Sequence, residues 1–78
     1  MAKTPVQNTI RKCRFEADEM TQKALAELVG VTRQTIIAIE NAKYSPTLEL
    51  AFQIAAVFGK DLSDVFTYAP ARPKGSTS

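Results

Sequence analysis

Hydrophobic residues recur three and four positions apart through most of the chain, which is the spacing of amphipathic helices. A first helix is predicted to begin at Asn8 or Thr9, because either side chain can cap free backbone N–H groups. The preceding residues, 1–7, lack this spacing and are expected to form a flexible arm. No pattern of alternating residues that would indicate a β-strand is found anywhere. The hydrophobic positions of the first helix are Ile10, Cys13, Phe15 and Ala17.

Two short helices joined by a tight turn are predicted between Thr21 and Tyr44. Thr21 can cap the second helix, and Gly30 can end it, because glycine readily takes the positive φ that follows a helix C-terminus. Thr32 is suited to cap the third helix. The second helix is expected to bury Ala24, Leu25, Leu28 and Val29. The third is expected to bury Thr35, Ile36 and Ile39 and to leave Arg33, Gln34, Ile37, Ala38 and Asn41 on its outer side.

A fourth helix is predicted to begin with Ser45 as its cap and Pro46 at the first helical position, where a missing N–H has no consequence. It is expected to end at Gly59, and a short fifth helix begins at Asp61. The fourth helix is hydrophobic almost all round, so we expect one side to lie in the core and another against a second subunit. The side expected to face that subunit carries Leu50 and Val57. The tail, 69–78, has the proline, glycine and serine content of a disordered end.

Composition limits the classes of function. With 78 residues, the chain has room for one domain, residues 8–68, and one modest core. A net charge of +2 is only mildly basic, so any positive field for nucleic acid must come from local placement. There is no histidine and Cys13 is the only cysteine, so neither a zinc site nor an intramolecular disulfide is expected.

The sequence also favours a cytoplasmic location and gives no sign of a cofactor or a small-molecule ligand. No hydrophobic run is long enough to span a membrane, and no secretory signal pattern is found, so a soluble cytoplasmic protein is expected. No cofactor and no small-molecule ligand are predicted. An enzyme is the weakest interpretation, because the sequence contains no glycine-rich phosphate loop and no pair of carboxylates placed for acid–base work.

Taken together, these motifs resemble the Xre-type helix-turn-helix family of bacterial and phage regulators, which includes the phage Cro and repressor proteins. The resemblance runs from Ile10 to about Tyr68, and its segments are IRKCR, MTQKALAELVGVTRQTIIAIENAKY, SPTLELAFQIAAVFG and DLSDVF. It implies an all-α, five-helix, lambda-repressor-like fold in which helices two and three form the helix-turn-helix. It also implies a homodimer on a palindromic operator in double-stranded DNA.

The resemblance carries further expectations for single residues. It implies a partly buried ion pair between Arg14 and Glu40. The chain departs from the family pattern at two turns. Asp18 and Glu19 stand where many members have a single glycine, which lengthens the first turn. Ala42 stands where glycine usually follows the recognition helix, so that helix is expected to end differently or with mild strain.

The outer side of the third helix carries side chains suited to reading DNA bases in the major groove. Arg33 can pair with the O6 and N7 atoms of guanine. Gln34 can pair with adenine N6 and N7, or it can contact phosphate instead. Ile37 and Ala38 together form a small hydrophobic spot that fits the methyl group of thymine.

Other residues are suited to the DNA backbone. Gln22 and Thr32 lie where helices begin, and the free N–H groups and partial positive charge there favour phosphate oxygens. The resemblance assigns backbone contacts to Gln22, and to Asn41 and Lys43 after the recognition helix. The basic residues expected to flank this docking surface are Lys3, Arg11, Lys12, Lys23 and Lys43.

We therefore expect a homodimeric, sequence-specific DNA-binding regulator that represses by occluding a promoter. Two alternatives stay open within this fold: an antitoxin or restriction-modification controller, and a protein-interaction module that does not bind DNA. The sequence does not distinguish among them.

Overall fold

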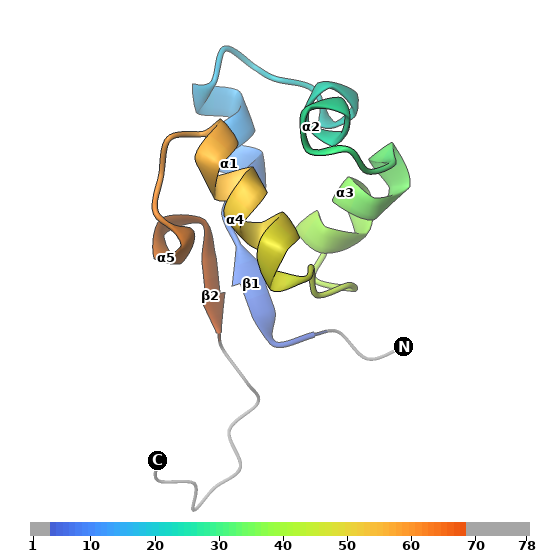
Figure 1. The fold of residues 1–78 in the computed structure, drawn as a ribbon, viewed down its shortest axis with the longest axis vertical. Coiled ribbons are helices and arrows are strands. Elements are labelled where there is room, and N and C mark those ends of the chain that lie inside the picture. Colours follow the sequence, from blue (N-terminus) through green and yellow to red (C-terminus); the bar gives the residue numbers. More distant parts are fainter. Residues whose placement is uncertain (1–3, 69–78) are drawn as a thin grey trace, which may run out of the picture.

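Five helices and two short strands make up residues 4–68, the part of the chain that the computed structural model describes (Figure 1). In chain order they are β1 Val6–Asn8, α1 Ile10–Glu16, α2 Gln22–Val29, α3 Arg33–Glu40, α4 Leu48–Val57, α5 Leu62–Val65 and β2 Phe66–Tyr68. The predicted all-α, five-helix class is confirmed, with a small sheet added to it. The predicted disordered tail, 69–78, lies outside the described residues.

The two strands join opposite ends of the domain. β1 and β2 pair antiparallel, with Val6 opposite Tyr68 and Asn8 opposite Phe66. The prediction that the chain has no strand was therefore wrong, and Val6 and Gln7 lie in β1 although they were expected in a loose arm. Each strand has only three residues, which is too short for alternation to be recognised in the sequence.

The helix caps on either side of the α2–α3 turn are those that the sequence predicts. The Thr21 hydroxyl accepts a hydrogen bond from the Ala24 N–H at 3.0 Å, and the Thr32 hydroxyl accepts one from the Thr35 N–H at 3.2 Å. Gly30 has a φ of +76° and ends α2 as expected. These three local features set where α2 ends and where α3 begins.

The starts of α1 and α4 differ in detail from the prediction. Thr9 is the N-cap position of α1, but the cap hydrogen bond comes from Asn8, whose Oδ1 accepts from the Ile10 N–H at 3.1 Å. The N-cap of α4 is Thr47 rather than Ser45, and its hydroxyl accepts from the Leu50 N–H at 3.1 Å. Serine and threonine are comparable caps, and Pro46 is compatible with the extended backbone before a helix, so the prediction placed the start too early.

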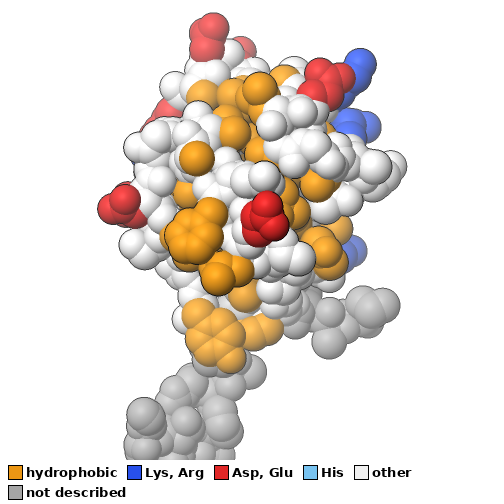
Figure 2. All heavy atoms as spheres, viewed as in Figure 1, with side chains coloured by type: hydrophobic (Ala, Val, Ile, Leu, Met, Phe, Trp, Pro, Cys, Tyr) orange, Lys and Arg blue, Asp and Glu red, His pale blue; other side chains and the backbone are white. Residues whose placement is uncertain are grey.

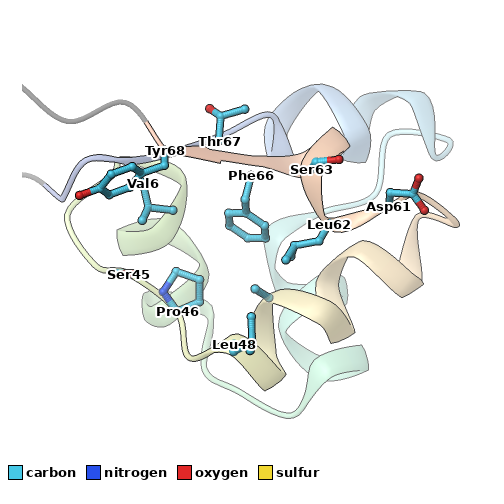
Figure 3. A pocket seen from close by; sticks show the side chains of 11 residues that line it. Val6, Ser45, Pro46, Leu48, Asp61, Leu62, Ser63, Phe66, Thr67 and Tyr68 are labelled. Carbon is cyan, nitrogen blue, oxygen red and sulfur yellow. The ribbon is translucent and has the colours of Figure 1, made fainter. Parts of the chain in front are cut away.

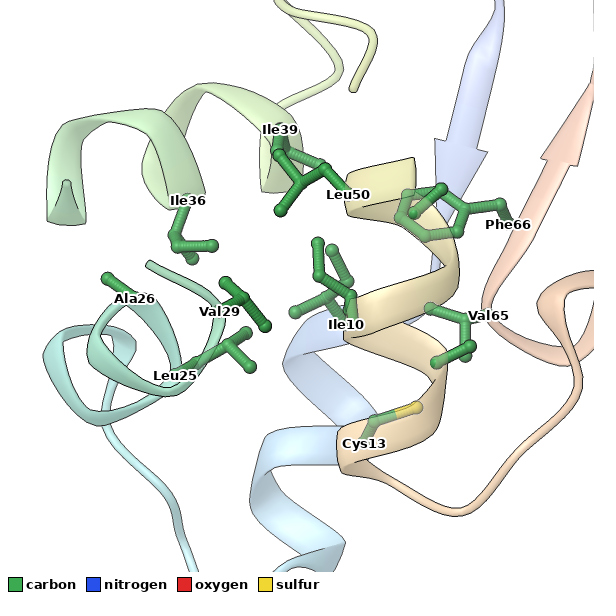
Figure 4. Close-up of a cluster of buried hydrophobic side chains, with 13 residues drawn as sticks. Ile10, Cys13, Leu25, Ala26, Val29, Ile36, Ile39, Leu50, Val65 and Phe66 are labelled. Carbon is green, nitrogen blue, oxygen red and sulfur yellow. The ribbon is translucent and has the colours of Figure 1, made fainter. Parts of the chain in front are cut away.

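The core lies where α2, α3 and α4 meet the first residues of α1 and the end of α5 (Figure 4). Burying one such aliphatic side chain stabilises the fold by about 1.5–3 kcal/mol. No polar or charged side chain of residues 4–68 is fully buried. The side chains with no exposed surface are Ile10, Leu25, Ile36, Ile39, Ile54 and Val65.

Two hydrophobic residues are exposed, and one of them, Leu28, was expected inside. Leu28 of α2 is 62% exposed, and Phe15 of α1 is 68% exposed. In α2 the buried residues are Leu25, Ala26 and Val29, because this helix packs against both α3 and α4. Helical spacing fits either stripe equally well, and only the packing partners decide which one faces inward.

The central helix α4 is covered within its own chain more fully than expected. The prediction that Leu50 and Val57 face a second subunit was wrong. Leu50 is buried and Val57 packs against the core, so neither side chain is available for that contact. Contacts with α2 and α5 supply the second cover that the hydrophobic sequence of α4 requires. The large hydrophobic residues of α4 that are exposed are Leu48, at 66%, and Phe52, at 53%.

Candidate nucleic-acid interface

The outer side of α3 is accessible at every position that the sequence proposes for DNA contact. Arg33, Gln34 and Asn41 are exposed, whereas Ile37 and Ala38 are half-buried. Ile36 and Ile39 anchor the opposite side of the helix in the core. The expected division of α3 into an inner and an outer side is therefore confirmed, while the contacts of the outer side remain a proposal.

A cleft beside α3 brings several of these residues together with other basic side chains. Gln22, Arg33 and Asn41 are the predicted site residues that line it. Thr32, Gln34, Ile37, Ala38 and Lys43 do not line this cleft. The complete lining is Arg11, Arg14, Thr21, Gln22, Lys23, Arg33, Glu40 and Asn41.

The bottom of the cleft is a hydrogen-bonded network centred on Glu40. Arg14 donates from Nε to Glu40 Oε2 at 2.7 Å and from Nη2 to Oε1 at 3.1 Å. The two side chains are only 15% and 8% exposed, so the expected partly buried ion pair is confirmed. Two parallel bonds between a guanidinium and a carboxylate fix the relative orientation of both groups, which ties α1 to the end of α3.

Two more bonds extend this network to the first turn and to α2. Arg14 Nη1 donates to the Met20 carbonyl at 2.8 Å, which holds the turn containing Asp18 and Glu19. Both of those residues have positive φ, 63° and 58°, so the lengthened turn passes through two left-handed residues. Gln22 Nε2 donates to Glu40 Oε1 at 3.1 Å, a bond that the sequence did not suggest.

The bond to Glu40 gives Gln22 a structural role in addition to the predicted phosphate contact. One N–H of its amide is directed to Glu40, which leaves the second N–H for another acceptor. Gln22 therefore connects the start of α2, where phosphate contact was predicted, to the end of α3. No spacing rule indicates such a bond, because the two residues belong to different helices.

The basic residues expected to flank the docking surface do not all lie near it. Arg11 and Lys23 line the cleft beside α3. Lys12 instead lines a separate small cavity that also contains Glu16, Lys60 and Asp64. Lys12 is thus removed from the predicted set because it points to another side of α1. Lys3 lies outside the described residues.

The end of α3 has the geometry of a Schellman motif with alanine in the glycine position. Ala42 has a φ of +58°, its N–H donates to Ile39 O, and the Lys43 N–H donates to Ala38 O. The expected mild strain is confirmed, since a side chain in the left-handed region costs about 1–2 kcal/mol. Ala42 is also buried, and its methyl group contributes packing that glycine would lack.

Two contacts from the N-terminal residues hold this same end of α3. The Asn8 side chain donates from Nδ2 to the Ile39 carbonyl at 2.8 Å. The backbone N–H of Thr4 donates to the Ala42 carbonyl at 2.8 Å. Neither contact was predicted, because residues 1–7 were expected to form a loose arm and Asn8 was considered only as a helix cap. They become recognisable only once β1 is paired with β2.

Among residues 4–68, no group of three or more histidine, cysteine, aspartate or glutamate side chains is placed to hold a metal ion. None of the helices described is long and apolar enough to cross a membrane.

Comparison with known proteins agrees with this geometry. A helix-turn-helix family model matches residues 10–65, which is more than half of the chain. The chain belongs to the Xre-type helix-turn-helix family. The resemblance found in the sequence is thereby confirmed, and membership in this family implies DNA binding and transcription regulation.

Individual relatives of the chain carry the same description. An uncharacterized HTH-type transcriptional regulator of Methanocaldococcus jannaschii is 57% identical over 49 residues, 63% of this chain and 74% of that protein. One from Methanothermobacter thermautotrophicus is 53% identical over 58 residues, 73% of this chain and 83% of that protein. The regulator YgzD of Bacillus subtilis, also described as uncharacterized, is 50% identical over 46 residues, 59% of this chain and 70% of that protein.

Proposed function

We propose that this helix-turn-helix protein is a homodimeric repressor that binds a palindromic operator in double-stranded DNA. α3 enters the major groove, where Arg33, Gln34, Ile37 and Ala38 contact base edges. The DNA backbone is contacted by Gln22, Thr32, Asn41 and Lys43. Repression by occluding a promoter requires only that the protein occupies its site.

The observation that carries the proposal is the position of the Glu40 network directly beside the outer side of α3. Arg33 and Asn41 lie along the same cleft as the Arg14–Glu40 pair, and Gln22 bonds to Glu40. An interface that reads bases requires side chains held in one register relative to the backbone contacts. A network that joins α1, α2 and α3 supplies that rigidity.

The charge distribution supports the same orientation. Arg11, Lys23 and Arg33 line the cleft, and its one carboxylate, Glu40, is already paired with Arg14. Seen from the side of α4, the Lys and Arg side chains in view lie along the edge next to α2 and α3 (Figure 2). A mildly basic chain thus presents a local positive surface, which is the footprint expected for a phosphate backbone.

A hydrophobic face on the side of α4, α5 and β2 supports the homodimer. A groove there is lined by Val6, Ser45, Pro46, Leu48, Ala51, Asp61, Leu62, Ser63, Phe66, Thr67 and Tyr68 (Figure 3). We call this groove, together with exposed Phe52 beside it on α4, the α4–α5 face. Hydrophobic side chains gather over α4 and continue toward the end of β2 (Figure 2).

This face has the features that a two-fold interface requires. It combines a groove with projecting side chains, of which Leu48 is 66% exposed and Tyr68 is 72% exposed. A two-fold interface uses the same surface on both copies, so projections of one copy must fit recesses of the other. Dimerisation of this kind places two recognition helices about one DNA turn apart, roughly 34 Å.

Selection of bound duplexes from a random pool, followed by mobility-shift titration, tests the proposal. We expect an inverted repeat whose half-sites are centred about 10 base pairs apart, and a complex that contains two protein copies. The control is a duplex of the same length and composition with a scrambled sequence. Equal affinity for the selected and scrambled duplexes would overturn sequence-specific binding, and absence of any shift would favour the protein-interaction alternative.

A further inference from the structure

One side chain joins the start of α1 to the end of the recognition helix. Asn8 Nδ2 donates to the carbonyl of Ile39 at 2.8 Å, and Asn8 Oδ1 accepts from the N–H of Ile10 at 3.1 Å. The two polar groups of one amide therefore hold two helices at once. Ile10 and Ile39 have no exposed surface and Asn8 is half-buried, so this bridge lies at the edge of the hydrophobic core.

The main chain around Asn8 is fixed from its other side. Asn8 is paired with Phe66 in the two-stranded sheet, and the Thr9 N–H donates to the Val65 carbonyl at 2.9 Å. The Thr9 hydroxyl also donates to the Asp64 carbonyl at 3.1 Å. Because α5 and β2 hold the main chain here, the Asn8 side chain is a short link between that part of the fold and α3.

Asn8 holds α3 at a second point, next to the one held by Arg14. The Arg14–Glu40 pair fixes the side chain of the last residue of α3, whereas Asn8 fixes the carbonyl of Ile39, the residue before it. A single attachment point would leave the end of the helix able to rotate about that point. Two attachment points, one through a side chain and one through the main chain, fix its orientation.

The residues proposed to contact bases lie close to this second attachment point. Ile37 and Ala38 directly precede Ile39, and Arg33 lies six residues before it, about 9 Å along the helix axis. A tilt of α3 by about 10° would move Arg33 by roughly 1.5 Å relative to Ile39. Donor–acceptor distances in hydrogen bonds vary by only about 0.5 Å, so a shift of this size breaks contacts to base edges.

We infer that Asn8 is a positioning residue for base recognition, which sets the discrimination between DNA sequences without contacting DNA. Its amide supplies the donor that holds α3 and the acceptor that holds α1. This inference rests on the proposed DNA binding. It adds to that function a residue outside the helix-turn-helix, before the first residue that the family model matches, Ile10.

The test compares Asn8→Asp with the wild type on the selected operator and on the scrambled duplex. Aspartate keeps an oxygen for the Ile10 N–H at nearly the same volume, but it lacks the donor for the Ile39 carbonyl. We expect the ratio of the two dissociation constants, scrambled over operator, to fall about 10-fold, which is the discrimination that one base contact supplies. Asn8→Ser adds no charge, and its hydroxyl can still accept from a nearby N–H but does not reach Ile39, so it should lower the ratio by the same factor.

Two controls separate positioning from charge and from stability. Gln7→Glu adds the same negative charge at the neighbouring, exposed residue of β1 and should leave the ratio unchanged. Gly59→Ala strains the turn before α5, where φ is +65°, and should lower stability while leaving the ratio unchanged. Urea denaturation of each variant at the titration temperature verifies that it is folded.

The outcomes also separate this inference from the proposed function. If the wild type prefers the operator and both Asn8 variants prefer it by the same factor, DNA binding stands and the positioning role is wrong. An equal fall in the ratio for Gln7→Glu or Gly59→Ala would also overturn the inference. If the wild-type protein binds neither duplex, the proposed function itself fails, and this inference fails with it.

Discussion

The outer side of α3 and the α4–α5 face are both exposed, but they differ in the chemical character of their side chains. The first is polar and basic, and it is held in place by helix caps and by the Arg14–Glu40 network. The second is hydrophobic, and it is the outer layer of a helix whose other sides lie in the core. Directional hydrogen bonds suit a surface that recognises DNA bases, whereas a hydrophobic groove suits a surface that binds a second copy of the protein.

The largest effect is expected from breaking the network under the α3 surface. Glu40→Ala leaves the Arg14 guanidinium without its partner in a mostly buried position, so the free energy of unfolding should fall by about 3–5 kcal/mol. Urea denaturation measures this loss. Glu49→Ala, at an exposed position of α4, is the matched control and should change stability by less than about 0.5 kcal/mol. Equal losses for the two variants would show that the network does not stabilise the fold.

The next effect concerns the α4–α5 face. Phe52→Glu places a charge on the proposed two-fold interface, so the protein should become monomeric and its apparent operator affinity should fall about 100-fold, or about 2.7 kcal/mol. Sedimentation and mobility shift together measure this result. The unfolding curve should stay close to wild type, because Phe52 is 53% exposed within one chain.

An exposed phenylalanine elsewhere provides the control for that variant. Phe15 of α1 is 68% exposed and does not line the groove of the α4–α5 face. Phe15→Glu should therefore remain dimeric and bind the operator normally. If the Phe15 variant dissociates and the Phe52 variant does not, the interface lies on α1 instead.

A smaller effect is expected for a single base contact. Arg33→Ala should cost about 1–3 kcal/mol per half-site and relax base preference at one operator position, because a paired contact to guanine is lost. Competition titrations with single-base operator variants measure both quantities. Lys60→Ala removes a cation that pairs with Glu16 outside the cleft, and it should leave specificity unchanged. A loss for Arg33→Ala that is the same on every sequence would assign Arg33 to phosphate.

The smallest effect is expected from substituting the glycines in the turns that precede α3 and α5. Gly30 precedes α3 and Gly59 precedes α5, with φ values of +76° and +65°. A methyl group added at either position meets no atom within 4 Å, so only backbone strain opposes it. Gly30→Ala and Gly59→Ala should each lower the free energy of unfolding by about 1 kcal/mol. A much larger loss at only one of them would mean that its turn also carries packing.

Local features of the fold were accessible from the sequence alone. Thr21, Thr32 and Gly30 act on backbone groups within a few residues, so their identities were enough to place the ends of α2 and α3. The outer side of α3 followed from helical spacing, because Ile36 and Ile39 left only one side for the core. The Arg14–Glu40 pair was expected through the family resemblance rather than from spacing.

Other features were decided only by the tertiary structure, because they depend on which distant segments meet. Helical spacing in α4 fits burial of Leu50 or of Phe52, and contacts with α2 and α5 selected Leu50. β1 and β2 are each too short to show a pattern, and they form because the fold brings residues 6–8 beside residues 66–68. The Gln22–Glu40 and Thr4–Ala42 bonds join residues that are far apart in the sequence, so no local rule could indicate them. The sequence by itself determined the helices and the side of α3 left for DNA, whereas packing decided how that surface is held and which hydrophobic residues remain for a second copy.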